Sequence, residues 1–166
     1  MYHEKLSSPW TSALFLALML IFGLLAASRW QNSGWDALTI LLAGLGAVFL
    51  FYTWNYRTLE ISLSAQELVL KFGVFTWRVP LSNVAGCALD DRLAPLERYG
   101  GAGIHFMSID GRYRASLNFL EYPRIVIALK RQVGPVRDVS FTTRRPEDVL
   151  RLLRAAAKEQ AAHAIV

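Results

Sequence analysis

The residues of this chain that could do chemistry include a glycine-rich segment in the second half of the sequence. Gly100-Gly101-Ala102-Gly103 could cradle a phosphate, but a phosphate-binding loop also needs a following Lys-Ser/Thr and a helix. Here Ile104-His105-Phe106 follows and continues as a strand-like run. The segment is therefore interpreted as a loop that enters a strand.

Histidine and paired acids are the next candidates. His105 could act as a base or a metal ligand, but the other two histidines lie near the ends of the chain, so no cluster has metal-ligand spacing. Asp90 and Asp91 are adjacent, and adjacent residues in a strand point to opposite faces, so these carboxylates are poorly placed to share a site. His105 is interpreted as a structural or surface residue.

The single cysteine, Cys87, excludes an internal disulfide and a cysteine-based metal cluster. It lies in an apolar stretch without a nearby base in the sequence, which indicates a buried thiol rather than a nucleophile. The sequence contains no Gly-x-Ser-x-Gly, no His-Glu-x-x-His and no protein-kinase motif set. We therefore expect no catalytic, cofactor or metal site, and a protein that is not an enzyme.

The arginines are more informative about function than the histidine, acidic and cysteine residues. The chain carries 18 Lys and Arg against 13 Asp and Glu, a net charge of +5. Five arginines and one tyrosine gather around a long loop and the hairpin after it, and we take them as the candidate interaction surface: Arg92, Arg98, Tyr99, Arg112, Arg114 and Arg124. If that hairpin folds towards a bilayer, its arginines would meet anionic headgroups, each contributing about 1 kcal/mol near the surface.

The alternative for these arginines is a solvated face on which nearby acids are their partners: Asp90, Asp91, Glu97 and Asp110. Glutamate substitutions at Arg112 and Arg114 would distinguish a lipid-sensing domain from a protein-docking module, because they should release a lipid binder from vesicles and leave partner capture largely intact. Nucleic-acid binding is not expected, since the basic residues are not clustered with aromatic ones.

Two uncharged stretches precede this region and predict transmembrane helices at about 11–28 and 37–54. A helix of about 18 residues is about 27 Å long, close to a hydrocarbon core of about 30 Å. Tryptophans stand at all four borders, where an indole is both apolar and hydrogen-bonded: Trp10, Trp30, Trp35 and Trp54. The polar connector is short, so residues 1–56 are predicted to form an antiparallel hairpin integral to a lipid bilayer.

Two alternatives concern this hairpin. A cleaved signal peptide would use Lys5 and a site near Ala26-Ala27-Ser28, but the apolar region exceeds the usual length and a second span follows at once. Small residues could pack the two helices together or mark an oligomer interface: Gly23, Ala27, Ala43, Gly44 and Ala47. Lys5 and Arg57 outweigh Arg29, which places both termini in the cytoplasm.

Residues 57–166 change to the period of two that is typical of strands. Apolar runs predict seven or eight strands, at 59–63, 68–72, 75–79, 84–89, 104–109, 113–119, 125–129 and 136–141, with Asp110-Gly111 as a hairpin turn. A C-terminal helix is predicted at about 146–162, because Pro146 and two acids start an apolar stripe at helical spacing. This order favours a mainly β, partly open barrel with a capping helix.

Several short motifs resemble those of the bacterial pleckstrin-homology-like domains. The run from Leu68 to Phe75, followed by Val79-Pro80-Leu81-Ser82-Asn83-Val84, is similar to a hairpin and "I-P-L-x-x-I" step of that group. The segments 98–104 and 143–149 are similar to those of its membrane-anchored members. The resemblance covers about residues 57–157 and implies a partly open barrel of about seven strands, a C-terminal capping helix and a binding or scaffolding role.

Two functions are carried forward from these observations. The first is a membrane-anchored interaction module that docks a partner protein, or its own copies, at sheet edges and the loop 90–103. The second is a domain that senses anionic lipid headgroups through its arginines. A prokaryotic inner membrane, crossed twice, suits the resemblance as the location.

Overall fold

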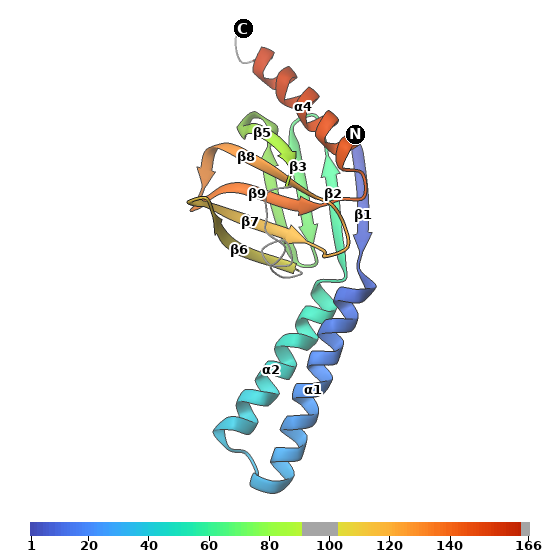
Figure 1. Ribbon diagram of the computed structural model, residues 1–166, viewed down its shortest axis with the longest axis vertical. Helices are drawn as coiled ribbons and strands as arrows, with labels where there is room; N and C mark the ends of the chain where they lie inside the picture. The colour runs from blue at the N-terminus through green and yellow to red at the C-terminus, as the bar shows by residue number, and fades with distance from the viewer. Residues whose placement is uncertain (91–102, 164–166) are drawn as a thin grey trace. The chain divides into compact units, whose positions relative to one another are not determined.

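The computed structural model describes residues 1–90 and 103–163. The chain forms two compact units, coloured along the sequence in Figure 1: a helical unit, Ser7–Thr58, and a β unit made of Met1–Leu6 and Leu59–Val166. The β unit therefore takes residues from both sides of the helices in the sequence. Each unit is described by itself.

The helical unit consists of two helices, α1 (Pro9–Ser33) and α2 (Ala37–Asn55), joined by a short connector. The predicted spans 11–28 and 37–54 lie inside them. Both helices are long and apolar enough to cross a membrane, by length and composition. Many of their large apolar side chains point outward, among them Leu20, Leu24, Ile40 and Leu41.

Capping side chains fix where both helices begin. Ser8 Oγ accepts a hydrogen bond from the backbone N–H of Thr11 at 3.0 Å, and the Asp36 carboxylate accepts one from Thr39 at 2.8 Å. Asp36 also binds Arg29, with 2.6 Å between Nη2 and Oδ2. Hydrogen bonds from Arg29 and then from Thr39 lower the pKa of Asp36. The connector is thus closed by an internal ion pair.

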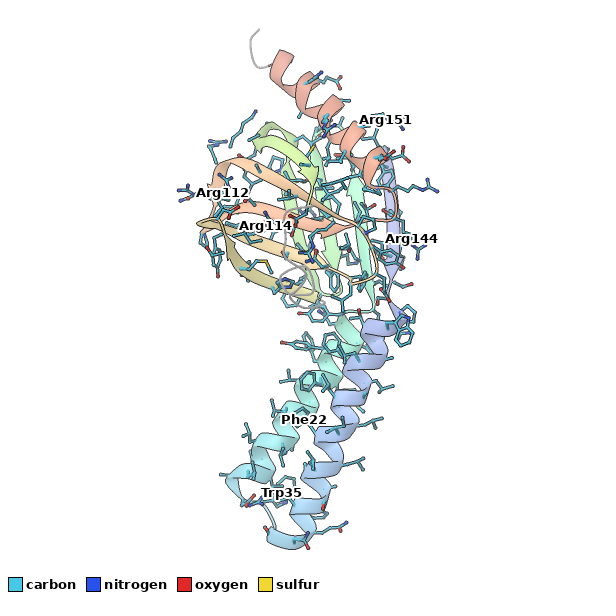
Figure 2. All side chains as sticks on the ribbon, in the orientation of Figure 1. Phe22, Trp35, Arg112, Arg114, Arg144 and Arg151 are labelled. Atoms are coloured by element: carbon cyan, nitrogen blue, oxygen red, sulfur yellow. The ribbon has the colours of Figure 1, made fainter. Side chains whose placement is uncertain are left out.

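Aromatic rings fill the interface between the two helices. The ring of Phe22 on α1 stacks on that of Phe49 on α2, with 5.5 Å between centroids and an interplanar angle of 9° (Figure 2). Phe15 contacts Tyr52 at 5.5 Å and Tyr56 at 5.9 Å. The pair is therefore held by side-chain packing within the unit.

The predicted close approach of small residues occurs at one pair of glycines. A Cβ at Gly46 would lie 3.6 Å from the backbone nitrogen of Gly23, so these backbones are separated by little more than a methyl group. Ala27, Gly44 and Ala47 are exposed and point away from the partner helix. The prediction is correct for Gly23, whereas its partner is Gly46 and not Gly44.

The first sheet of the β unit has four strands in the order β1 (Tyr2–Ser7), β2 (Thr58–Leu63), β3 (Glu67–Phe72) and β4 (Phe75–Pro80). The β2–β3 and β3–β4 pairs are antiparallel. Alternate residues are fully buried, including Leu59, Ile61, Leu68, Leu70 and Phe72. One face of this sheet is thus the apolar core predicted by the period of two.

Strand β1 was not predicted, since residues 1–56 were assigned as a whole to the helical hairpin. The hydropathy pattern of this strand is weak, because Leu6 is its single buried residue. Polar cross-strand contacts attach it instead: Lys5 Nζ lies 3.0 Å from a carboxylate oxygen of Glu60, and His3 Nδ1 lies 3.0 Å from Ser62 Oγ. A polar edge strand of this kind gives little signal in hydropathy.

The second sheet has five strands in the order β5-β8-β9-β7-β6. Their bounds are β5 (Val84–Leu89), β6 (Gly103–Ile109), β7 (Arg112–Asn118), β8 (Arg124–Val133) and β9 (Val136–Thr142), and a short helix, η1 (Leu81–Asn83), precedes β5. Asp110 and Gly111 both have positive φ, 51° and 73°, which confirms the predicted two-residue hairpin turn. β7 and β9 pair in parallel.

The two sheets share one apolar core, and helix α4 (Pro146–His163) packs against β5, β8 and η1. The Phe72 and Phe119 rings, which join the sheets, have centroids 5.0 Å apart. Val149 and Leu153 are the fully buried residues of the helix. The described residues contain nine strands, where about seven were expected, and no strand pairing joins the two sheets among them. The β region is thus open, as predicted.

Glu4 fastens β1 to the segment before α4. Its carboxylate accepts hydrogen bonds from Thr143 Oγ1 at 2.5 Å and from the backbone N–H of Arg144 at 3.1 Å. We expect Glu4→Ala to lower the free energy of unfolding by about 1–3 kcal/mol, because hydrogen bonds to a charged group are lost. Denaturant unfolding of the full chain in detergent measures this. Glu67→Ala, which removes an exposed ion pair with Arg78, should cost less than about 1 kcal/mol; equal losses would contradict the role of Glu4.

Candidate functional site

The five-stranded sheet has a second face that is polar and yet buried. Ala115, Leu117, Ile125 and Ile127 point into the core, so the residues that alternate with them point to the opposite side. We call this opposite side the polar face; its buried side chains are Asp90, Arg114, Ser116, Asn118, Arg124, Asp138, Ser140 and Thr142. Buried polar groups of this number must be paired with one another to be tolerated.

Hydroxyl groups on the polar face satisfy each other. Ser116 and Ser140 are opposite each other in the parallel β7–β9 pair, and their Oγ atoms lie 2.7 Å apart. Thr142 Oγ1 accepts the backbone N–H of Phe119 at 3.0 Å. Because no described base hydrogen-bonds to either serine hydroxyl, this arrangement stabilises the pairing of the strands and does not activate a nucleophile.

Asp90 is the acidic centre of the polar face. Its Oδ2 accepts a hydrogen bond from Arg114 Nη1 at 2.8 Å and lies 3.8 Å from Arg124 Nη1. All three side chains are less than 10% exposed. With its carboxamide oxygen turned towards Arg124, Asn118 accepts from Nη2 and Nε at 3.2 and 3.3 Å. Two buried guanidinium groups are thus held by one carboxylate and one amide.

Arg112 and Asp138 form a second ion pair at the end of the polar face. Arg112 Nε donates to both carboxylate oxygens, at 3.1 and 3.0 Å, and Nη2 lies 2.7 Å from Oδ1. These hydrogen bonds raise the pKa of Arg112. Figure 2 shows Arg112 beside the hairpin turn and Arg114 farther along β7. The bidentate geometry fixes the guanidinium and leaves it a limited capacity for another anion.

The structure brings three predicted site residues together but does not make them a free charged surface. Arg114 and Arg124 are buried and share the single carboxylate of Asp90, and Arg112 is held by Asp138, so none of the three guanidinium groups is without an acidic neighbour. Glutamate at Arg114 would bury two like charges side by side and unfold the sheet, so the proposed pair of substitutions does not isolate lipid binding. The predicted residues Arg92, Arg98 and Tyr99 lie outside the described residues.

His105 belongs to the same row of the sheet as Ser116, which it opposes in the β6–β7 pair. Both of its ring nitrogens are buried and have no hydrogen-bond partner among the described residues. Burial, followed by the positive charge of Arg124, lowers the pKa of His105. The neutral imidazole is therefore the form that the fold favours.

We expect this histidine to make the fold weaker in mild acid. The unfolded chain binds a proton near pH 6.5 while folded His105 resists it, so stability falls as the pH drops below about 6.5 towards the lower folded pKa. His105→Gln should show a smaller fall in melting temperature between about pH 7.5 and about pH 5.5 than the wild type. His3→Gln on the exposed edge strand is the control, and an unchanged pH response in His105→Gln would refute the expectation.

A cavity of about 400 Å³ lies beside the polar face. Its charged lining includes Arg112 and Arg114 together with Asp90, Asp110 and Asp138. Both arginines are paired with acids of this same lining. The cavity therefore offers neither a strong net charge nor a free acid–base pair to a substrate.

The described residues give little support for a metal site or for a reactive thiol. They contain no group of three or more His, Cys, Asp or Glu side chains that could hold a metal ion. Cys87 is partly exposed and not buried as expected, and desolvation raises the pKa of its thiol, which disfavours the reactive thiolate. Arg154, which donates to the Cys87 carbonyl oxygen at 3.4 Å, opposes this shift without reversing it.

Three aromatic side chains of the β unit pack against one another; we call Trp77, Phe106 and Tyr113 the aromatic patch. Phe106 and Tyr113 are exposed, whereas Trp77 is partly buried and its indole nitrogen is buried. The Phe106 and Tyr113 rings are stacked, with 6.1 Å between centroids and 6° between planes, and Trp77 lies 6.5 Å from Phe106. Phe106 is 51% exposed and Tyr113 39%. Trp77 and Phe106 come from β4 and β6, the edge strands of the two sheets. Exposed, mutually packed rings at free edges suit a protein contact.

The sequence did not single out the aromatic patch. Phe106 and Tyr113 alternate with the same period as the buried Ala115 and Leu117, so hydropathy alone assigns them to the core. The contact between Trp77 on β4 and Phe106 on β6 would have been the signal for the patch, and it is not local in sequence.

No known family model matches this sequence, and no curated protein is significantly similar to it. The interpretation of the site therefore depends on the residues and geometry described above.

Proposed function

We propose that this protein is a membrane-anchored, non-catalytic interaction module that docks a partner protein, or a second copy of itself, at the cytoplasmic face of the inner membrane. The aromatic patch is the observation that carries this proposal. It combines large exposed rings with two strand edges, and both features are common at protein interfaces.

The helical unit supports the anchor. Two apolar helices of 25 and 19 residues suit a bilayer crossing, and their exposed leucine and isoleucine side chains would face lipid. Strongly exposed tryptophans lie at both ends of the helices, as expected of rings in the headgroup zone. They are Trp10 and Trp54 at one end, and Trp30 and Trp35 at the other. We infer two spans joined by the short connector.

The charge distribution supports cytoplasmic termini. The connector holds one basic residue, Arg29, which is paired with Asp36 at 2.6 Å. Two basic residues flank the other ends of the helices: Lys5, which is paired with Glu60 at 3.0 Å, and Arg57. Positive residues near the span ends favour the cytoplasmic side. A pleckstrin-homology-like domain anchored in this way is the architecture we propose, and its role is binding.

The burial of two arginines weakens the case for the alternative function, the sensing of anionic lipid headgroups. That function needs accessible arginines, and Arg114 and Arg124 are buried and paired. The polar face instead supports a rigid sheet that presents the aromatic patch. We therefore place the docking role ahead of lipid sensing for the β unit.

Site-specific photo-crosslinking in intact cells tests the proposal. The full chain would carry a photoreactive phenylalanine analogue at Phe106, and a matched sample would carry it at Val133, which is similarly exposed at 45% but lies at the end of the interior strand β8. We expect protein adducts at position 106 and few at 133. An adduct of twice the 18.7 kDa chain mass identifies a second copy, and any other mass identifies a different protein. Equal labelling at both positions, or lipid adducts alone at 106, would overturn the docking role.

A further inference from the structure

A groove of about 680 Å³ lies within the helical unit, between the beginning of α1 and the end of α2. Every lining residue belongs to this unit, so the groove does not depend on the β unit. Its volume falls within the range of about 300–1,000 Å³ that is usual for small-molecule sites.

The lining changes character along the helices. The part of the groove farther from the helix ends is lined by Ala13, Leu16 and Leu50. The part near the helix ends is lined by Trp54 and Arg57. Leu16 and Leu50 are roughly 8–10 Å from the ends of their helices, at a rise of 1.5 Å per residue. The groove is therefore apolar within and cationic at its mouth.

Arg57 is exposed and has no ion pair among the described residues. Three of the hydroxyl groups that line the groove already donate hydrogen bonds: Ser8 Oγ to Thr11 Oγ1 at 2.7 Å, Ser12 Oγ to the Ser8 carbonyl at 3.1 Å, and Thr53 Oγ1 to the Phe49 carbonyl at 2.8 Å. An occupant with a charged head must therefore be an anion that receives hydrogen bonds from Arg57.

We propose that this groove binds one anionic glycerophospholipid, with the phosphate at Arg57 beside the Trp54 indole and an acyl chain along Leu16 and Leu50. The inference rests on the proposed location of the helices in a bilayer. Charge complementarity at the mouth and apolar lining behind it together match the two ends of such a lipid. The lipid would hold this end of the helices at the headgroup level.

Native mass spectrometry of the full chain, released from detergent with equal amounts of phosphatidylglycerol and phosphatidylcholine, tests the site. We expect the wild type to prefer phosphatidylglycerol and Arg57→Gln to lose about fivefold of that preference, the effect of about 1 kcal/mol per basic residue. Arg131→Gln, which removes an exposed charge from the β unit, should retain it. Ala13→Phe, which fills the groove, should reduce the binding of both lipids.

Three outcomes would overturn the inference. They are an unchanged preference in Arg57→Gln, an equal loss in Arg131→Gln, and displacement of the lipid by excess inorganic phosphate, which would identify a free-phosphate site. Alkaline extraction of cell membranes distinguishes failure of the lipid site from failure of the proposed membrane anchor. A chain that stays in the membrane but shows no Arg57-dependent preference loses the lipid site alone, whereas an extracted chain loses the anchor as well.

Discussion

Replacing Asp90 with alanine is expected to destabilise the β unit by about 3–5 kcal/mol, because it leaves a buried guanidinium without its carboxylate. Asp90 Oδ2 receives Arg114 Nη1 at 2.8 Å, and both side chains are less than 10% exposed. Arg124 Nη1, at 3.8 Å, loses the same counter-charge. Such a loss exceeds a quarter of the stability of most domains. Denaturant unfolding of the full chain in detergent, followed by tryptophan fluorescence, measures it.

Two further variants identify the cause of that loss. Glu121→Ala removes one exposed negative charge at a turn and should change the free energy of unfolding by less than about 1 kcal/mol. Asp90→Ala combined with Arg114→Met removes the charge on both sides and should recover part of the stability, since an apolar side chain of similar volume tolerates burial. If the double variant is no better than the single one, the ion pair is not what holds this face together.

The same ion pair explains what the sequence could not reveal about the candidate surface. Arg112, Arg114 and Arg124 were grouped because a hairpin and its flanking strands are close in sequence. The acids that pair with Arg114 and Arg112 are Asp90 and Asp138, which lie 24 and 26 residues away from them. Spacing does not encode such partners, and the parallel β7–β9 pairing that aligns Arg114 with Asp138 is not a local feature.

Features with a local cause were predictable to within a few residues. Uncharged runs and tryptophan borders predicted α1 and α2, and the start signal at Pro146 predicted α4 (Pro146–His163 in the structure, 146–162 expected). Apolar runs predicted β2 to β9, and in β2 and β3 every second side chain is buried. Strand β1 lacks that alternation of apolar residues, and its attachment through Lys5 and Glu4 is a contact between distant parts of the chain. It was therefore missed for a physical reason.

The aromatic patch gives the second large expected effect. Phe106→Asp should weaken binding of the captured partner by at least about 30-fold, since truncating an aromatic residue at an interface centre commonly costs about 2 kcal/mol or more. The stability of the fold should change little, because half of the Phe106 side chain is already exposed. Titration of the crosslinked partner, or sedimentation if the partner is a second copy, gives the dissociation constant.

Val133→Asp is the matched control, because it places the same charge on a strand residue of similar exposure, 45%, away from the aromatic patch. It should leave the dissociation constant within about twofold of the wild type, as expected of a substitution outside the interface. A loss in both variants would indicate a general effect of added negative charge on the β unit. A loss in neither would remove the patch as the docking surface, even if the helices anchor the chain as proposed. If only Phe106→Asp weakens binding, the stacked Phe106–Tyr113 pair lies at the contact. The Tyr113 ring is the nearest ring that the new carboxylate would disturb.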